Sequence, residues 1–385
     1  MESQLADLGR QQESPAAESP IPFNDLLVQW REIDAAVRRD FDDVFARSAF
    51  CLGPYVEAFE NEIAAYLGVR HAVAVNSGTS SLHIALLAAG IGPGDEVLVP
   101  AQTFIATVWG ALYVGATPVL CDVDEATATI NLEDAERRVT ARTKALLPVH
   151  LFGQPANMDG VAAFADRHKL TAIEDSAQAI GATWSGRRVG TLGRMGCFSF
   201  YPGKNLGGAG EGGLVVTDDP VLAERLRSLR NHGQRERYLH AELGFNYRMD
   251  GLQAVVLTHK LRRLEAWTER RRQLAALYQE ALNGLPIEVP AIHHQDHVWH
   301  LFVIRTPMRE ALREHLRAAG IECGLHYPVP LHRQPCLGAF GIDAEAYPAA
   351  DRWAREGLSL PLYYGMTDEQ VLRVANTVRD FYEHG

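Results

Sequence analysis

The stretch from Phe198 to Gly208 most constrains what this chain can fold into, because it holds one lysine between glycines and apolar residues. Lys204 follows Gly203 and is followed closely by two more glycines. Glycines let the backbone turn tightly and let a flat ligand approach. Apolar neighbours lower a lysine pKa, and a neutral amine can form a Schiff base. The stretch fits a nucleophilic lysine, although alone it fits a lysine in a glycine-rich hairpin equally well.

Strand and helix patterns alternate along the first half of the chain, up to Asp175. The expected helices are 54–67, 82–89, 105–114, 132–139 and 158–168, and the expected strands are 72–76, 96–100, 118–123, 145–149 and 170–174. This alternation predicts an α/β fold with a mostly parallel central sheet and helices on both faces. Ligands of such sheets bind at the carboxyl ends of the strands.

The pattern changes after Asp175. Expected strands are 182–184, 196–200, 213–217, 298–305 and 321–327, and expected helices are 220–230, one long helix from 250 to about 282, 308–319, 344–356 and 367–384. A chain of 385 residues exceeds the usual size of a single core. We therefore expect three parts: a mobile N-terminal tail (1–20), a large α/β domain (21–250), and a connecting helix with a smaller C-terminal α+β domain (251–385).

Charge and composition exclude several classes of protein. The formal net charge of −11 argues against a nucleic-acid partner, which would need a basic stripe. No apolar run approaches the ~18–20 residues that span a membrane, and no signal peptide is visible. Five scattered cysteines without a CxxC pair indicate a reduced, cytoplasmic protein, and no His/Cys spacing suggests a metal site.

Two stretches resemble nucleotide-binding motifs, but each lacks a feature that the motif requires. The glycines from Gly208 to Gly213 match GxGxxG, but a strand pattern follows them where the dinucleotide fingerprint requires a helix. Lys204 is followed by Asn205, whereas a P-loop lysine is followed by Ser or Thr. Neither motif therefore predicts a nucleotide site.

Four features make chemical sense together. Lys204 could form an imine with an aldehyde, and Asp175 could pair with a ring nitrogen. Gly78-Thr79-Ser80 could hold a phosphate at a helix start, and Phe104 could stack on a planar ring. Separately, each also fits a structural role: a helix cap, a turn carboxylate or a core aromatic. Pyridoxal 5′-phosphate is the cofactor that has a matching group for each feature: an aldehyde, a pyridine nitrogen, a phosphate and a planar ring.

Longer stretches resemble a known family. Asn76-Ser77-Gly78-Thr79-Ser80, Glu174-Asp175-Ser176-Ala177-Gln178 and the Lys204 stretch look like signatures of the DegT/DnrJ/EryC1/StrS sugar aminotransferases, which are fold-type I pyridoxal phosphate enzymes. The stretches 244–249 and 326–332 extend the resemblance over nearly the whole chain after about residue 20.

The resemblance implies a role for each matching residue. Lys204 would bind the cofactor aldehyde as a Schiff base and then shuttle a proton. Asp175 would pair with the pyridine nitrogen, Gln178 would contact the ring, and Phe104 would stack on it. The phosphate would be held by Gly78, Thr79, Ser80 and Ser199, and by Asn246 of a neighbouring subunit. That last contact implies a homodimer with a shared active site.

The resemblance further implies transfer of an amino group from glutamate to a nucleotide-linked keto-sugar, as in the biosynthesis of amino sugars for polysaccharides. Tyr247-Arg248-Met249 is more similar to branches that act at C3 of a deoxysugar than at C4. The candidate substrate residues are Arg237, Arg248, His326, Tyr327 and His332. A C4 enzyme, an inactive regulatory homologue and a fold-type I enzyme of another reaction remain alternatives. Lys204 separates the chain from a dehydrating branch that has His there, and Glu211 replaces a common Asp.

Overall fold

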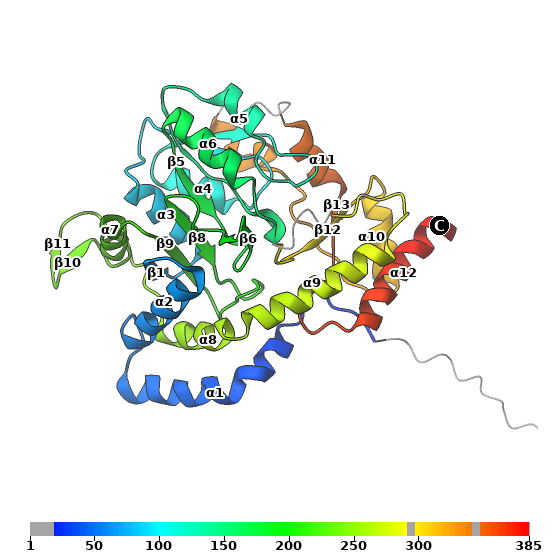
Figure 1. The fold of residues 1–385 in the computed structure, drawn as a ribbon, viewed down its shortest axis with the longest axis horizontal. Coiled ribbons are helices and arrows are strands. Elements are labelled where there is room, and N and C mark those ends of the chain that lie inside the picture. Colours follow the sequence, from blue (N-terminus) through cyan, green and yellow to red (C-terminus); the bar gives the residue numbers. More distant parts are fainter. Residues whose placement is uncertain (1–18, 291–296, 341–346, 385) are drawn as a thin grey trace, which may run out of the picture.

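The computed structural model describes residues 19–290, 297–340 and 347–384. A seven-stranded sheet lies among helices, and a smaller group of C-terminal elements packs beside it (Figure 1). A mobile tail was predicted for residues 1–20, and residues 1–18 of it lie outside the described residues. The domain boundaries 21–250 and 251–385 stay predictions.

The central sheet is mostly parallel, as predicted. Its order is β1-β9-β8-β5-β4-β2-β3, and only β9 runs antiparallel to its neighbours. The strands in this order are His71–Val75, Gly213–Thr217, Met195–Ser199, Thr171–Asp175, Thr143–Leu146, Glu96–Pro100 and Thr117–Cys121. Nearly all their side chains are buried, because helices cover both faces.

One face of the sheet packs on three helices: α3 (Gly78–Ala88), α4 (Ala106–Tyr113) and α7 (Pro220–Arg230). The opposite face packs on α2 (Pro54–Leu67), α8 (Gly251–Leu261), α5 (Leu132–Arg138) and α6 (Met158–His168). Alternate strand residues divide between the faces, so that Val73 and Val75 face the first group while Ala72 and Ala74 face the second. Side-chain caps start several of these helices, at Ser77, Asn131, Asn157 and Asp219.

The C-terminal elements form a second core. It contains the antiparallel strands β12 (Phe302–Arg305) and β13 (Gly357–Leu360) and the helices α9 (Leu264–Ala281), α10 (Arg309–Ala318) and α12 (Asp368–His384). Ile21, near the other end of the chain, is fully buried in this same core. The remaining elements are α1 (Leu26–Arg47), α11 (Pro348–Glu356), the hairpins β6–β7 (Thr183–Trp184, Arg187–Arg188) and β10–β11 (Gln234–Glu236, Leu239–His240), and the 3₁₀ turns η1 (Leu151–Gly153), η2 (Leu331–Arg333) and η3 (Pro335–Phe340).

The prediction of a single helix from 250 to about 282 is wrong. The structure has two helices, α8 and α9, separated at Arg262 and Arg263. Neither proline nor glycine marks this break in the sequence. The two helices serve different cores, because α8 packs on α1 and α2 while α9 packs in the C-terminal core. Arg262 is also held by Glu62 of α2 at 2.6 Å.

Two expected strands are shorter in the structure. The stretch 298–305 is a strand only from Phe302, since Val298 and Leu301 donate their N–H groups to Gly153 and Phe152. The stretch 321–327 forms isolated bridges, from Ile321 to Ile21 and from Gly324 to Ser359. Tertiary contacts, which a local pattern does not encode, account for both differences.

The end of β5 is fixed by a buried carboxylate. Glu174 accepts hydrogen bonds from the N–H groups of Gly190, Leu192 and Gly193, at 2.6 Å each. It also accepts from Nε2 of His150 at 2.9 Å, since Nδ1 of that ring accepts the N–H of Ala156. The side chain is fully buried. Glu174 therefore locks the strand that carries Asp175.

We predict that Glu174→Gln destabilises the fold by about 3 kcal/mol, because the amide NH₂ would face N–H donors. The thermal unfolding midpoint of each purified variant measures this loss. Glu314→Gln, at an exposed helix position, is the matched control and should change stability by less than about 0.5 kcal/mol. Equal stability of the two variants would contradict the assigned role of Glu174.

Candidate active site

A cavity of about 810 Å³ lies at the carboxyl ends of β5 and β8. It brings together nine of the residues singled out in the sequence: Gly78, Thr79, Phe104, Asp175, Gln178, Ser199, Lys204, His326 and Tyr327. Its wall is completed by residues from both ends of the chain, including Asn24, Arg271 and His300. The position agrees with the rule that open α/β sheets bind ligands at the carboxyl edge.

Lys204 lies in the loop after β8, where its N–H donates to the carbonyl of Tyr201 at 2.8 Å. Gly207 allows this turn, since a Cβ there would come within 2.1 Å of the Pro202 carbonyl oxygen. Burial lowers the pKa of the Lys204 amine to about 8, and the nearby Asp175 carboxylate partly offsets that shift. An amine with this pKa is partly neutral near pH 8 and can act as a nucleophile or a base.

Asp175 ends β5 with only 5% of its surface exposed. One carboxylate oxygen accepts the hydroxyl of Thr107 at 2.8 Å, and the other accepts the N–H of Ala177 at 3.2 Å. The Thr107 oxygen in turn lies 3.0 Å from the hydroxyl of Thr103. Burial raises the pKa of this carboxyl, against the effect of the hydrogen bonds and Lys204. The carboxylate is thus oriented, and a cationic ring nitrogen would compensate its charge.

The start of α3 forms an anion cup. Gly78 and Thr79 open this helix, and first-turn N–H groups have no acceptor inside their own helix. Gly78 lies so close to Ser199 that an added Cβ would come within 2.6 Å of the serine Cβ. Ser80 does not line the cavity: its N–H and hydroxyl both bind the capping oxygen of Ser77. The cup thus consists of two amides and the Ser199 hydroxyl.

Gln178 and Phe104, which were expected to contact the cofactor ring, both lie against Tyr327 from the C-terminal part of the chain. Gln178 donates to the hydroxyl of Tyr327 at 2.9 Å and accepts the N–H of Phe152 at 2.6 Å. The Phe104 ring is half exposed and lies 5.6 Å from the Tyr327 ring, centroid to centroid. A planar ligand between Asp175 and the cup would therefore meet aromatic and amide groups.

Sequence reasoning missed Asn205 and His300, which support Lys204. The Asn205 amide donates to the Val298 carbonyl at 2.8 Å, so its oxygen faces Nδ1 of His300 at 3.2 Å. That nitrogen must carry the proton. Burial and the Lys204 and Arg271 cations hold the pKa of His300 well below its usual range. Its Nε2 is therefore an unprotonated acceptor. The sequence signal for this contact was the position of Asn205 directly after Lys204.

Several predicted substrate residues lie elsewhere in this subunit. Arg237 is exposed on the β10–β11 hairpin, where it lies over the ring of Tyr238. Arg248 donates to Asn231 and to the sulfur of Cys51, and His332 pairs with Asp351. Asn246 lies beside Asn231, outside the lining of the cavity.

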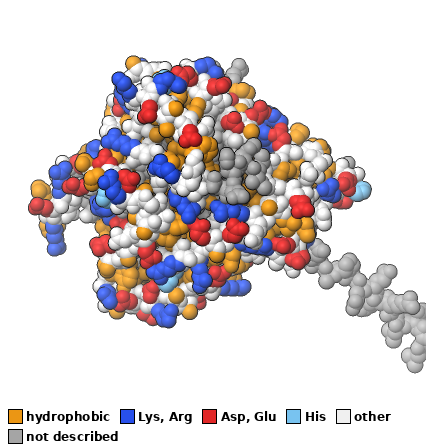
Figure 2. Space-filling model, viewed as in Figure 1, with side chains coloured by type: hydrophobic (Ala, Val, Ile, Leu, Met, Phe, Trp, Pro, Cys, Tyr) orange, Lys and Arg blue, Asp and Glu red, His pale blue; other side chains and the backbone are white. Residues whose placement is uncertain are grey.

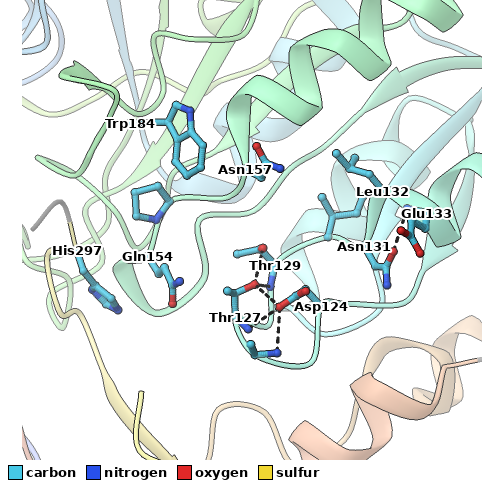
Figure 3. A pocket seen from close by; sticks show the side chains of 13 residues that line it. Asp124, Thr127, Thr129, Asn131, Leu132, Glu133, Gln154, Asn157, Trp184 and His297 are labelled. Carbon is cyan, nitrogen blue, oxygen red and sulfur yellow. Dashed lines mark hydrogen bonds between the residues drawn. The ribbon is translucent and has the colours of Figure 1, made fainter. Parts of the chain in front are cut away.

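A second cavity, of about 590 Å³, shares no lining residue with the first. Figure 3 shows hydrogen bonds within part of its polar lining, where Asp124 accepts from the loop around Thr127 and Asn131 accepts the N–H of Glu133. It contains none of the residues predicted for the site. In the described ranges there is also no group of three His, Cys, Asp or Glu side chains that could hold a metal ion, and no helix is long and apolar enough to cross a membrane.

The fold and the cavity together define a pyridoxal 5′-phosphate-dependent aminotransferase. The residues present fit the cofactor, because a lysine of lowered pKa, a buried carboxylate and an amide cup line one cavity. The family model of the DegT/DnrJ/EryC1/StrS aminotransferase family matches residues 31–379, and the chain belongs to this family.

Similar proteins agree with this assignment. The chain is 47% identical, over 96% of its length and 98% of the relative, to the dTDP-3-amino-3,4,6-trideoxy-alpha-D-glucose transaminase of Streptomyces venezuelae. It is 42% identical, over 94% and 99% of the two chains, to a pleiotropic regulatory protein of Geobacillus stearothermophilus. The crystal structure of S. venezuelae DesV superposes with a TM-score of 0.93 at 46% identity, covering 95% of this chain and all of the other.

We predict that Lys204 in the cofactor-free protein reacts with an acylating reagent with a midpoint near pH 8, since only the neutral amine reacts. Asp175→Asn should move this midpoint to lower pH, because the Asp175 carboxylate raises the pKa of Lys204. Mass spectrometry of the peptide that contains residue 204 measures the rate. The exposed Lys144 is an internal control, whose acylation should not differ between the two proteins. A midpoint that is unchanged in Asp175→Asn would refute the coupling.

Proposed function

We propose that this aminotransferase moves an amino group from glutamate to the C3 ketone of a nucleotide-linked deoxysugar. The observation that carries the proposal is the common cavity of Lys204, Asp175 and the anion cup. The name of the similar S. venezuelae transaminase places the amino group at C3 of a dTDP-linked sugar, which supports C3 over C4 here. The five cysteines have no cysteine partner, in keeping with a cytoplasmic enzyme.

Bound pyridoxal 5′-phosphate would carry the amino group between the two substrates and withdraw electrons from the carbon that loses its proton. Asp175 would hold a positive charge at the ring nitrogen, with Thr107 and Ala177 fixing its carboxylate. The amides of Gly78 and Thr79 and the Ser199 hydroxyl would hold the phosphate.

Lys204 would anchor the cofactor and then act as the general base and acid. Its amine would take a proton from the reacting carbon of glutamate and return one to the neighbouring position. A pKa of about 8 suits both directions near neutral pH. Glutamate would leave as 2-oxoglutarate, and the ketone oxygen of the sugar would leave as water.

The amination assay tests the function. Purified enzyme with glutamate should convert nucleotide-linked 3-keto sugars to amino sugars with equimolar 2-oxoglutarate, at a kcat/KM about a hundredfold above that for 4-keto sugars. Lys204→Ala should form no product. Preference for 4-keto sugars would overturn the C3 proposal, and loss of every sugar reaction by a folded, cofactor-loaded protein would favour the regulatory role named for the G. stearothermophilus relative.

We propose a homodimer with shared sites. The β10–β11 hairpin projects from the body of the subunit in Figure 1. Its apolar residues are exposed to solvent, with Tyr238 at 79% and Leu239 at 57% exposure, and Leu243, just after the hairpin, is 91% exposed. Arg237 on this hairpin and Asn246 near its base lie outside their own subunit's cavity. A partner that covers the hairpin would bring these polar residues to the partner's site.

Mixed dimers test the sharing. Lys204→Ala and Asn246→Ala homodimers should each be nearly inactive, but co-refolding them should restore about a quarter of wild-type activity, because half the dimers then hold one intact site of two. The test compares the activity of the mixture with that of the separate variants. A mixture no more active than its components would show that each site uses the lysine and asparagine of one chain.

A further inference from the structure

Arg271 of α9 is a buried arginine that lines the cavity and has no carboxylate partner among the described residues. Only 4% of its surface is exposed. Its Nη1 donates to the backbone carbonyls of Trp299 at 3.0 Å and Leu362 at 2.9 Å, with His300 more distant at 3.5 Å. Nε and Nη2 have no protein acceptor within the described ranges.

The other buried arginines of the described chain are paired. Arg230 binds Glu60, and Arg305 binds Glu288. The neighbours of Arg271 on α9 also have carboxylates, since Arg270 pairs with Asp368 at 2.8 Å. A buried cation without an anion is destabilising. The cavity thus offers a guanidinium whose charge a ligand would compensate.

Arg271 is linked through His300 to the loop that carries Lys204. It donates to the peptide oxygen of His300, whose ring binds Asn205, the residue after Lys204. Of the side chains lining the cavity, only Arg271 and Lys204 keep a positive charge at neutral pH, because burial lowers the pKa of His300 and His326. On the face shown in Figure 2, Lys and Arg side chains are interspersed with Asp and Glu, so no broad positive surface is seen there.

A guanidinium edge with two free donors matches a carboxylate better than any other small anion group except a phosphate. The cofactor phosphate already has the cup at Gly78, on the α3 side of the cavity. We propose that Arg271 binds a carboxylate of the amino donor through Nε and Nη2. This inference rests on the proposed function, which names glutamate as the donor, and it assigns a substrate contact to an arginine other than the predicted Arg237 and Arg248.

The two half-reactions separate this role from a structural one, because the donor carries carboxylates and the keto-sugar ring does not. In Arg271→Gln, the apparent Kd for glutamate in single-turnover experiments should rise about 10- to 100-fold. Amination of the sugar by enzyme pre-loaded with pyridoxamine 5′-phosphate should stay within about twofold of wild type. Arg270→Gln, one position earlier and paired with exposed Asp368, is the matched control and should change neither.

Binding of glutarate, a dicarboxylate without an amine, gives a readout independent of turnover. Calorimetry should detect glutarate binding to wild-type holoenzyme and to Arg270→Gln, and not to Arg271→Gln. If Arg271→Gln does not fold, Arg271→Lys tests the proposal instead. Lysine keeps the positive charge but loses the planar pair of donors that binds a carboxylate at two atoms. This variant should weaken glutamate binding several-fold and leave amination of the sugar intact.

Equal loss in both half-reactions, or unchanged glutamate and glutarate binding, would overturn the proposal. Failure of the proposed function is a separate result: a wild-type enzyme that converts glutamate to 2-oxoglutarate but aminates no sugar leaves the Arg271 test valid.

Discussion

The placement of a buried carboxylate and a partly buried amine in one cavity is the constraint on which the rest of the structure depends. Asp175 and the loop of Lys204 follow two adjacent parallel strands, β5 and β8, so both groups reach the same edge of the sheet. Removing either charge from water is costly, and the cost must be offset by hydrogen bonds and by the packing of the fold. Perturbed charges in a cavity are characteristic of catalytic sites.

The two ends of this arrangement are held by different parts of the chain. On the sheet side, Glu174 and Thr107 fix the strand and the carboxylate of Asp175. The C-terminal part supplies the rest of the wall, and it is tied to the sheet where Asp122 accepts the N–H groups of Ala349 and Ala350 at the start of α11. The cavity is therefore a product of docking between two cores, and either core alone would leave Lys204 open to water.

The fold class, the cofactor and most of the cofactor cavity could be predicted from the sequence, because glycines, strand ends and helix starts are local signals. Lys204, Asp175 and the Gly78 turn have such signals around them. Arg271 has none, since it stands among three consecutive arginines and only the packing of α9 decides which one is buried. The break between α8 and α9 was missed for the same reason. Arg248 was singled out by neighbouring motif residues, and Arg237 was a candidate by its charge; both lie outside the cavity of their own subunit because of the tertiary course of the chain.

The burial of Ile21 in the C-terminal core has a consequence for biosynthesis. Ile21 pairs with Ile321 and exchanges backbone hydrogen bonds with Gly320 and Glu322. A chain made from its N-terminus on the ribosome has no partner for this segment until some three hundred further residues have emerged. The large sheet can form in that interval, but the segment from Ile21 to α1 must wait. A late stage of folding then joins this segment to the C-terminal core, and a nascent chain stalled before that point would leave Ile21 exposed to water and to chaperones.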